Sequence, residues 1–281
     1  MMDVILAAAN SAVPLLLASL GVLLSERAGV LNISMEGCIT AGAFMTALVM
    51  AGGGNALAAV TAAIAVGAFF GSLLSGFHLL LTANLFIAGM GINLLIPSLA
   101  GLISQIVQGS RGAIHIPEAA QLMEWGLPYI TWLMVPLTLL TALLLTRSRF
   151  GSHIRAAESS PDFLRERGVS VEKTHFLVLV ISSAGAALAG AFLALRVGAY
   201  VPGMSSGRGW IALVIIWMGF RRPTGILISS FFFALIEILA GRAQGIGGIP
   251  VTLLLAMPSL AALTALTAAT IAYSSKTRLR G

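Results

Sequence analysis

The sequence predicts an all-α protein, a polytopic transmembrane helical bundle of nine or ten spans with one short cytoplasmic helix. Hydrophobic residues make up 58% of its 281 residues and charged residues only 9%, whereas a soluble chain has about 25% charged residues. Apolar runs recur that have the length of helices crossing a hydrocarbon core. These runs are continuous and do not alternate with polar residues, so a membrane β-barrel is not predicted.

Nine apolar runs account for the predicted spans. They cover residues 4–24, 38–50, 56–81, 85–107, 130–145, 176–195, 210–220 with its flanks, 226–240 and 251–273. A tenth crossing would arise if the polar stretch 25–37 breaks or re-enters the membrane, and the sequence leaves this open. The whole chain, 1–281, is interpreted as a single transmembrane domain that includes a hydrophilic loop at 147–174.

The distribution of Lys and Arg predicts how the chain is oriented. Six of the 16 basic residues lie in the loop 147–174. Stepping through the later spans places this loop, the pair Arg221 and Arg222, and the basic C-terminal tail on one side. Because basic residues favour the cytoplasmic side, we expect that side to be cytoplasmic and the N-terminus to lie outside. The net charge of +6 follows the ends of the apolar runs, so it does not indicate nucleic-acid binding.

The hydrophilic loop contains the pattern of a short helix, Pro161–Arg167. Ser160 could cap it, a proline suits its first position, and Gly168 suits the position after its end. Phe163 and Leu164 supply apolar contacts. A helix of this length is not stable alone, so it must pack against something. A helix resting on lipid headgroups is the alternative, but the interleaved acids and bases favour a protein partner.

Polar residues interrupt the apolar pattern between the first two spans. Asn32 and Glu36 lie four positions apart there, so in a helix they would share one face. Polar groups at membrane depth mark a pathway or a site by default. A plain cytoplasmic turn is the alternative, and it suits the neighbouring Glu26 and Arg27 equally well. Asn32 and Glu36 are therefore predicted as candidate pathway residues.

A second polar insertion interrupts the apolar pattern at 83–95. Asn84 and Asn93 flank Gly89 and Gly91. Small residues let helices approach closely, and Asn93 can form a hydrogen bond across helices. Helix packing and substrate contact both fit this pattern and stay open.

Basic residues flank the span at 210–220. Arg208 is expected at the outer membrane interface, and Arg221 and Arg222 at the inner one. Glu237 is the single acidic residue of the last third of the chain. It lies in an apolar span, where it could pair with Arg242 or extend its carboxylate to the interface.

Motifs of enzymatic chemistry are missing from the sequence. It has no Gly-x-x-x-x-Gly-Lys-Ser/Thr loop for ATP, no His-Glu-x-x-His and no Gly-x-Ser-x-Gly. The four histidines do not pair with carboxylates at metal-ligand spacing, and the single Cys38 excludes an internal disulfide. We therefore expect no enzyme, no metal site and no cofactor.

Three of the polar stretches together form a specific set of motifs. They are Glu26–Ile33 with Glu36–Gly37, Ala88–Leu95, and Gly207–Leu213 with Gly219 and Arg222–Gly225. This set resembles the permease subunits of bacterial ABC importers of the branched-chain amino acid, ribose and nucleoside group. The resemblance runs from about residue 15 to residue 266 and is nearest the nucleoside branch. The chain lacks an extra N-terminal segment, so it resembles the shorter permease of a two-permease system.

The hydrophilic loop resembles the ATPase-docking region of the same family. The positions that match the family pattern are Arg155, Ala156, Pro161, Gly168 and Val169. The positions that depart from it are Glu158, where the family has Gly, Ser160, where it has Asn, and Phe163 and Leu164, where it has an Ala pair. These bulkier residues imply a matched surface on the partner.

The resemblance implies an importer in the bacterial inner membrane. Its expected partners are a second permease subunit, identical or different, two ATP-binding subunits on the cytoplasmic loops, and an extracytoplasmic substrate-binding protein. Asn32, Glu36, Asn93 and Asn84 would then be candidates for the solute path between the permeases. A nucleoside is the first expected substrate, and ribose or a related sugar, a branched-chain amino acid and a riboflavin-like vitamin are alternatives.

A secondary transporter driven by an ion gradient is the alternative from another class. It would need buried acids in several spans, and only Glu36 and Glu237 could serve. It would not need a capped cytoplasmic docking helix, so the ATP-driven importer is the favoured prediction.

Overall fold

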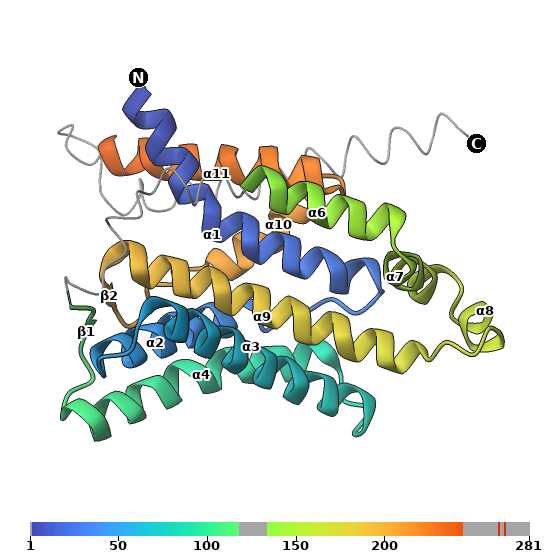
Figure 1. The fold of residues 1–281 in the computed structure, drawn as a ribbon, viewed down its shortest axis with the longest axis horizontal. Coiled ribbons are helices and arrows are strands. Elements are labelled where there is room, and N and C mark those ends of the chain that lie inside the picture. Colours follow the sequence, from blue (N-terminus) through green and yellow to red (C-terminus); the bar gives the residue numbers. More distant parts are fainter. Residues whose placement is uncertain (1, 118–133, 244–263, 265–266, 268–281) are drawn as a thin grey trace.

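The computed structural model describes residues 2–117, 134–243, 264 and 267, and most of them form an elongated helical bundle (Figure 1). The described elements are α1 (Met2–Arg27), α2 (Met35–Ala51), α3 (Ala56–Leu79), α4 (Leu85–Gln108), β1 (Ile114–His115), α6 (Met134–Arg147), α7 (Arg149–Ser159), α8 (Pro161–Glu166), α9 (Val171–Val197), β2 (Ala199–Tyr200), α10 (Arg208–Met218) and α11 (Pro223–Ala243). Five of them, α1, α3, α4, α9 and α11, are long and apolar enough to cross a membrane. The predicted helical class is confirmed, while the predicted last span and the C-terminal tail lie outside the described residues.

Helix α9 lies in the middle of the bundle, with α1, α2 and α3 packed against it (Figure 1). Glycines allow the closest of these approaches. A Cβ atom at Gly42 would collide with the backbone carbonyl of Ala187, and one at Gly190 would collide with the carbonyl of Ile39. The backbones of α2 and α9 are therefore in direct contact, as small residues permit in membrane bundles. This contact fixes the position of the polar segment that precedes α2.

The chain between α1 and α2, residues 28–34, is not helical. Most of it is nevertheless buried, and Asn32 and Ser34 have no exposed surface. Irregular backbone at membrane depth is tolerated only where protein or a water-filled cavity surrounds it. Because Asn32 precedes α2, it does not share a helix face with Glu36, and the prediction of a shared face was wrong.

Helix α10 is another short element next to irregular backbone. It follows a turn-rich segment in which Gly203, Ser206 and Gly207 have positive φ. Its 11 residues rise about 16 Å at 1.5 Å per residue, roughly half of a hydrocarbon core. The turn from α10 to α11 is also strained, because Phe220 and Arg221 have φ of 53° and 55° without being glycines.

The loop predicted at 147–174 is mostly helical. Helix α7 was not predicted, although its sequence explains it. Ser148 accepts a hydrogen bond from the Gly151 backbone N–H at 2.9 Å, which caps the helix. Ile154 and Ala157 are buried while most of the other side chains of α7 are not. The helix is therefore amphipathic and is stabilised by packing against the bundle.

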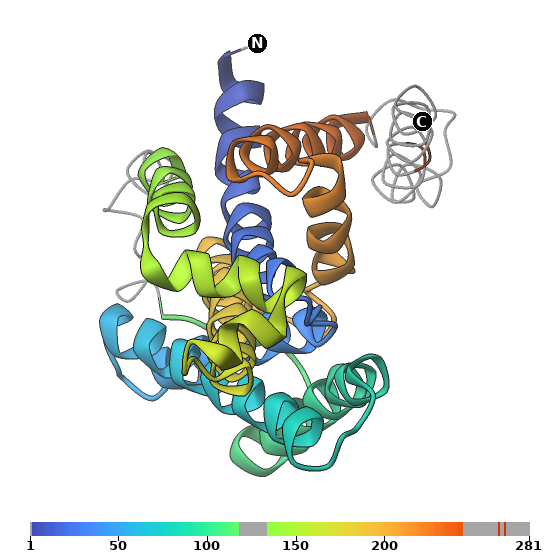
Figure 2. The same cartoon turned by 90° about the vertical axis from the view of Figure 1, so that its right-hand side faces the viewer.

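The two ends of the bundle differ. At one end β1 and β2 pair antiparallel, with Ile114 opposite Tyr200 and His115 opposite Ala199. Helices α7 and α8 lie at the other end (Figure 1). Figure 2 looks onto that end and shows α7 lying across helices that are seen nearly along their axes. In the predicted orientation the end with α7 and α8 is cytoplasmic.

Candidate functional site

Helix α8 presents one apolar side chain to solvent at the predicted cytoplasmic end. Phe163 is 49% exposed, whereas Leu164 is only 4% exposed and packs into the core. The guanidinium of Arg167 lies 4.5 Å from the centre of the Phe163 ring, a cation–π arrangement. Ser160 does not cap the helix with its side chain, contrary to the prediction. Its backbone carbonyl instead accepts from the Leu164 N–H at 3.4 Å.

The other residues of the predicted docking pattern lie on or near this surface. Arg155 is exposed on α7, and Ala156 and Pro161 are half-buried. Gly168 follows α8 with φ of 73°, a conformation in which glycine is favoured after a helix. An exposed arginine on α7 and an exposed aromatic ring on α8 therefore lie at the predicted cytoplasmic end, where they suit contact with a protein.

Arg221 connects three segments of the chain at the same end. Its Nη2 atom donates to both carboxylate oxygens of Glu158, at 2.7 and 2.9 Å. Its Nε atom donates to Glu26 Oε2 at 2.7 Å. Arg27 donates in turn from Nη2 to the Arg221 carbonyl at 2.6 Å. Burial opposes the charge on Arg221, but the hydrogen bonds to Glu158 and Glu26 raise its pKa above the ordinary value, so it stays a cation.

Glu36 caps the start of α10 from the first turn of α2. One carboxylate oxygen accepts from the Gly207 N–H and the other from the Gly209 N–H, both at 2.8 Å. A Cβ at Gly209 would lie 2.5 Å from the Glu36 backbone nitrogen, so only glycine permits this approach. A carboxylate at a helix N-terminus is stabilised by the helix dipole and by the free N–H groups. Glu36 is half-buried and thus joins α2 to α10.

Arg208 forms an ion pair with Glu237 of α11. Glu237 therefore pairs across helices and not with Arg242, which the sequence had suggested. Arg208 also donates to the Met204 carbonyl at 2.9 Å. This pair lies next to the start of α10, which Glu36 caps, while Arg222 is exposed beyond the other end of α10.

Asn32 occupies a closed hydrogen-bond network. Its Nδ2 atom donates to Ser182 Oγ at 3.1 Å and to Ser183 Oγ at 2.9 Å, both on α9. Its Oδ1 atom accepts from the N–H and the hydroxyl of Ser34, at 2.9 and 2.7 Å. The amide therefore ties the irregular segment 28–34 to α9 and satisfies its own polar atoms inside the protein.

Asn93 holds the start of α2, and Asn84 holds the start of α4. Asn93 Oδ1 accepts from the Gly37 N–H and its Nδ2 donates to the Ile33 carbonyl, both at 2.8 Å. Asn84 is exposed and caps α4, accepting from the Phe86 N–H at 2.8 Å. The structure thus brings Asn32, Glu36 and Asn93 together around the chain that leads into α2, and leaves Asn84 apart from them.

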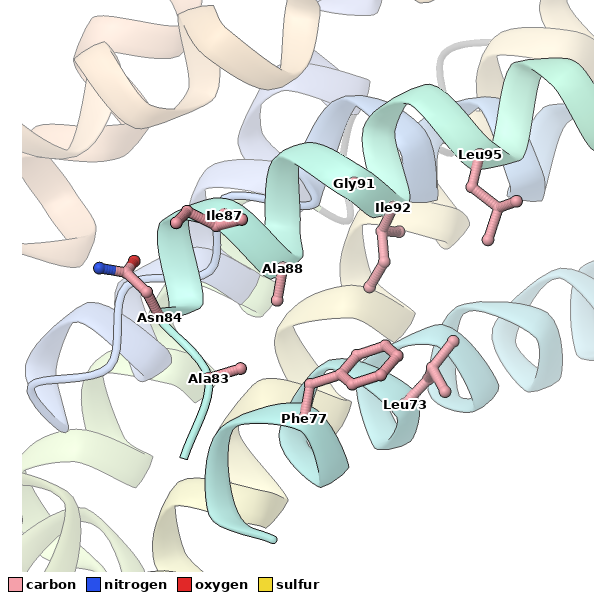
Figure 3. A pocket seen from close by; sticks show the side chains of 9 residues that line it. All are labelled: Leu73, Phe77, Ala83, Asn84, Ile87, Ala88, Gly91, Ile92 and Leu95. Carbon is pink, nitrogen blue, oxygen red and sulfur yellow. The ribbon is translucent and has the colours of Figure 1, made fainter. Parts of the chain in front are cut away.

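An apolar groove lies between α3 and α4 (Figure 3). Its volume is about 580 Å³, and Leu73, Phe77, Ile92 and Leu95 contribute to its lining. Asn84 is at its edge, with the amide directed away from Phe77 and Leu73 (Figure 3). A groove with this lining offers a polar solute few hydrogen-bond partners, so it is not a candidate for a polar path.

Most polar residues of the site could be identified from the sequence, but their hydrogen-bond partners could not. The hydroxyls of Ser182 and Ser183, which receive Asn32, belong to an adjacent serine pair within an otherwise apolar span, and that pair was a usable signal. The pairing of Arg221 with Glu158 had no signal, because 62 residues separate them in the chain. Among the residues described, His, Cys, Asp and Glu do not gather in threes at distances that could hold a metal ion.

Comparison with known proteins gives consistent matches over most of the chain. A family model described as branched-chain amino acid transport system, permease component, matches residues 4–271. A candidate glucose ABC transporter permease protein of Haloferax volcanii is 32% identical over 257 residues, covering 85% of this chain and 77% of the relative. The nucleoside ABC transporter permease protein of Lactococcus lactis is 27% identical over 272 residues, covering 87% of this chain and 85% of the relative.

Two further similarities complete the comparison. The guanosine ABC transporter permease protein of Bacillus subtilis is 27% identical over 251 residues, covering 82% of this chain and 79% of the relative. A solved structure, an inward-facing conformation of a candidate metal-chelate type ABC transporter, aligns with a TM-score of 0.52 and 19% identity. It covers 94% of this chain and 86% of that chain, and at this identity the likeness concerns the fold alone.

Proposed function

Because this chain belongs to the permease component family of branched-chain amino acid transport systems, we propose that it forms part of the solute path of an ATP-driven nucleoside importer. The chain is a permease subunit of an ABC transporter, and ATP is hydrolysed in a separate subunit. It is a multi-pass protein of the bacterial inner membrane, and it acts with ATP-binding subunits and a substrate-binding protein. This membership replaces the alternative of a transporter driven by an ion gradient.

The assignment of a nucleoside rests on one observation. Two relatives that match more than four fifths of this chain are named for nucleoside and guanosine transport. A nucleoside is a neutral polar solute, which fits a bundle whose charged groups, such as Glu36 and Arg208, are bound to other parts of the chain. Glucose is the second candidate, because the relative that is 32% identical is named for it.

Uptake measurements distinguish these substrates. The chain is produced with the ATP-binding subunit and binding protein that copurify with it, in cells that lack nucleoside uptake. We expect accumulation of tritiated uridine and guanosine that requires ATP and survives collapse of the proton and sodium gradients. Uptake of glucose without uridine or guanosine would overturn the nucleoside assignment in favour of a sugar. Ribose, branched-chain amino acids and riboflavin are tested as competitors in the same assay.

The proposed assembly has two permease subunits around one path, with two ATP-binding subunits beneath them. The second permease is a different chain in this proposal, as in two-permease nucleoside systems. The contact with the ATP-binding subunits is supported by Arg155 on α7 and Phe163 on α8, two exposed side chains that suit a protein partner. Native mass spectrometry of the purified complex tests the stoichiometry, and a complex with two copies of this chain would show a homodimer instead.

The docking surface and the path occupy different parts of the proposed permease domain, 1–281. Docking is assigned to the exposed residues around α7 and α8, with Leu164 supporting α8 from below. Asn32 and Asn93 act on the path by holding the irregular segment 28–34 and the start of α2, and Glu36 acts on it by joining α2 to α10. Their polar atoms are bound within the chain, so they shape the path more than they contact the solute. Asn84 is assigned to capping α4.

A further inference from the structure

We propose that Glu158 and Arg221 form a positioning pair through which movement of α7 and α8 reaches the interior of the bundle. This role depends on the proposed function, since it requires an ATP-driven subunit that moves these helices. It differs from the docking assignment in one respect. Glu158 acts on a residue of its own chain and not on the surface of the ATP-binding subunit.

The contacts of Glu158 and Arg221 join three segments. Glu158 lies in the last turn of α7, directly before α8, and accepts two hydrogen bonds from Arg221. Arg221 lies in the turn between α10 and α11, and its Nε atom binds Glu26 at the end of α1. Arg27 holds the backbone carbonyl of Arg221. The end of α7 therefore cannot shift without moving this turn or breaking the contacts.

Burial distinguishes this link from the other ion pairs of the same loop. The side chains of Arg221 and Glu158 are 26% and 39% exposed, and that of Glu26, which Arg221 also binds, is only 7% exposed. By contrast, Arg165 pairs with Asp162 and Glu172, and all three of these side chains are more than half exposed. Exposed pairs contribute little because water screens them. Within the described part of the chain, the Glu158–Arg221 pair is the ion pair that joins α7 to the turn between α10 and α11.

Helix α10 extends the link toward the middle of the bundle. One end of this rigid 11-residue helix meets the turn that holds Arg221. The other end is capped by the carboxylate of Glu36 through the Gly207 and Gly209 N–H groups. Glu36 itself begins α2, which packs against the central α9. A displacement at Glu158 is thus carried along α10 to the irregular segments that the proposed path requires.

The first test replaces Glu158 by Gln, which removes the charge and keeps the shape. The complete complex is reconstituted in proteoliposomes, and uridine transported per ATP hydrolysed is measured. We expect Glu158→Gln to keep binding of the ATP-binding subunit and to lower this ratio at least about fivefold, the low end of measured coupling between sites. Glu172→Gln is the matched control, because Glu172 also pairs with an arginine, but with Arg165 of the same loop. We expect Glu172→Gln to leave the transport ratio unchanged.

The second test asks whether Glu158 acts through Arg221. Arg221→Lys keeps the charge that Glu26 requires but cannot reproduce both donor positions of the guanidinium. We expect Arg221→Lys to lower the transport ratio, and Glu158→Gln to add little in the Arg221→Lys background. Independent, multiplicative losses would overturn the pairing. Loss of ATP-binding-subunit affinity in Glu158→Gln would overturn it as well, because Glu158 would then be a docking contact.

Failure of this inference is distinguishable from failure of the proposed function. If the unmodified complex shows no ATP-dependent uridine uptake, the proposed function is wrong. If it transports uridine and Glu158→Gln has the same transport ratio, the proposed function stands and the positioning role of Glu158 is wrong. Size-exclusion chromatography of each variant before reconstitution confirms that the complexes compared are intact.

Discussion

Single glycines decide how closely α2 and α9 approach. A Cβ at Gly190 has no room, because it would collide with the carbonyl of Ile39. Overpacking of this kind typically costs about 1–3 kcal/mol. Gly190→Ala is therefore expected to lower the thermal stability of the purified permease, measured by loss of the monodisperse peak in size-exclusion chromatography after heating.

A glycine on α4 supplies the matched control. A Cβ at Gly101 would have no neighbour within 4 Å. Alanine is a better helix former than glycine by about 1 kcal/mol, so Gly101→Ala should be neutral or slightly stabilising. Equal thermal stability of Gly190→Ala and Gly101→Ala would contradict the close contact between α2 and α9.

Asn32 gives a second prediction at the scale of one side chain. Asn32→Leu would leave the hydroxyls of Ser182 and Ser183 and the N–H of Ser34 without this partner in the interior. Each buried polar group left unpaired costs about 1–3 kcal/mol. We expect Asn32→Leu to reduce the yield of folded protein, whereas Asn84→Ala, which removes an exposed helix cap, should cost only about 1 kcal/mol. Normal yield and thermal stability of Asn32→Leu would show that the network is dispensable.

Sequence reasoning identified the important polar residues but not their contacts. Asn32, Glu36 and Asn93 were predicted because polar groups at membrane depth are costly. The free-energy cost of a polar side chain at membrane depth does not show whether a solute or the chain itself binds that side chain. The structure shows that Asn32 and Asn93 bind the chain. Such pairing across 56 to 151 positions of the chain depends on helix packing, which a single sequence does not encode in any local pattern.

At the scale of elements, the start of α10 depends on an acid from another helix. Glu36→Gln would remove the charge that binds the Gly207 and Gly209 N–H groups. Charge-assisted hydrogen bonds contribute about 1.5–3 kcal/mol, so hydrogen exchange at these two amides should become at least about tenfold faster. Mass spectrometry of peptides that contain Gly207 and Gly209 measures this rate. Glu237→Gln is the control, because Glu237 binds the side chain of Arg208 and not these amides, and equal acceleration in both variants would refute the capping role.

The predictability of an element follows from how it is stabilised. Helices α3 and α4 were predicted almost to their ends, because continuous apolar composition and length suffice to indicate a span. Helix α7 was missed, because its 11 residues are mostly polar and its stability depends on the burial of Ile154 and Ala157 against the bundle. The sequence left the path of 25–37 open, as a broken or re-entrant segment or a plain turn, and did not predict the hydrogen bonds that hold 28–34. Local propensity is a weak guide there, because hydrogen bonds from α9 and α4 replace those of a helix.

The distribution of charge describes the molecule as a whole. The positive-inside rule predicted a single basic end, and α7, α8 and the Arg221 turn do lie together at one end of the bundle (Figure 1). The same rule cannot predict which acids neutralise these bases. Glu26 and Glu158 bind Arg221 there, so the basic end is a structured surface with internal contacts. Phe163 and Arg155 are among the exposed groups at this end that a partner can reach.

We therefore expect docking of the ATP-binding subunit to depend on one of two adjacent apolar residues. Phe163 is 49% exposed and Leu164 only 4%. Phe163→Asp is expected to leave the permease folded and to weaken its binding of the ATP-binding subunit, because aromatic side chains dominate interface energetics and truncating a central one costs about 2 kcal/mol or more. Binding is measured by microscale thermophoresis with the purified subunit, where this cost is a loss of about thirtyfold in affinity.

Leu164→Asp separates docking from folding in the same assay. An unpaired carboxylate at a buried position is costly, so this variant should fail to yield stable protein before docking can be measured. If Phe163→Asp binds normally and the permease is folded, α8 does not form the docking contact. Transport would then have to be driven through another part of the cytoplasmic end, of which the exposed Arg155 on α7 is the next to test. If both variants misfold, Phe163 supports the structure of α8 instead of contacting a partner.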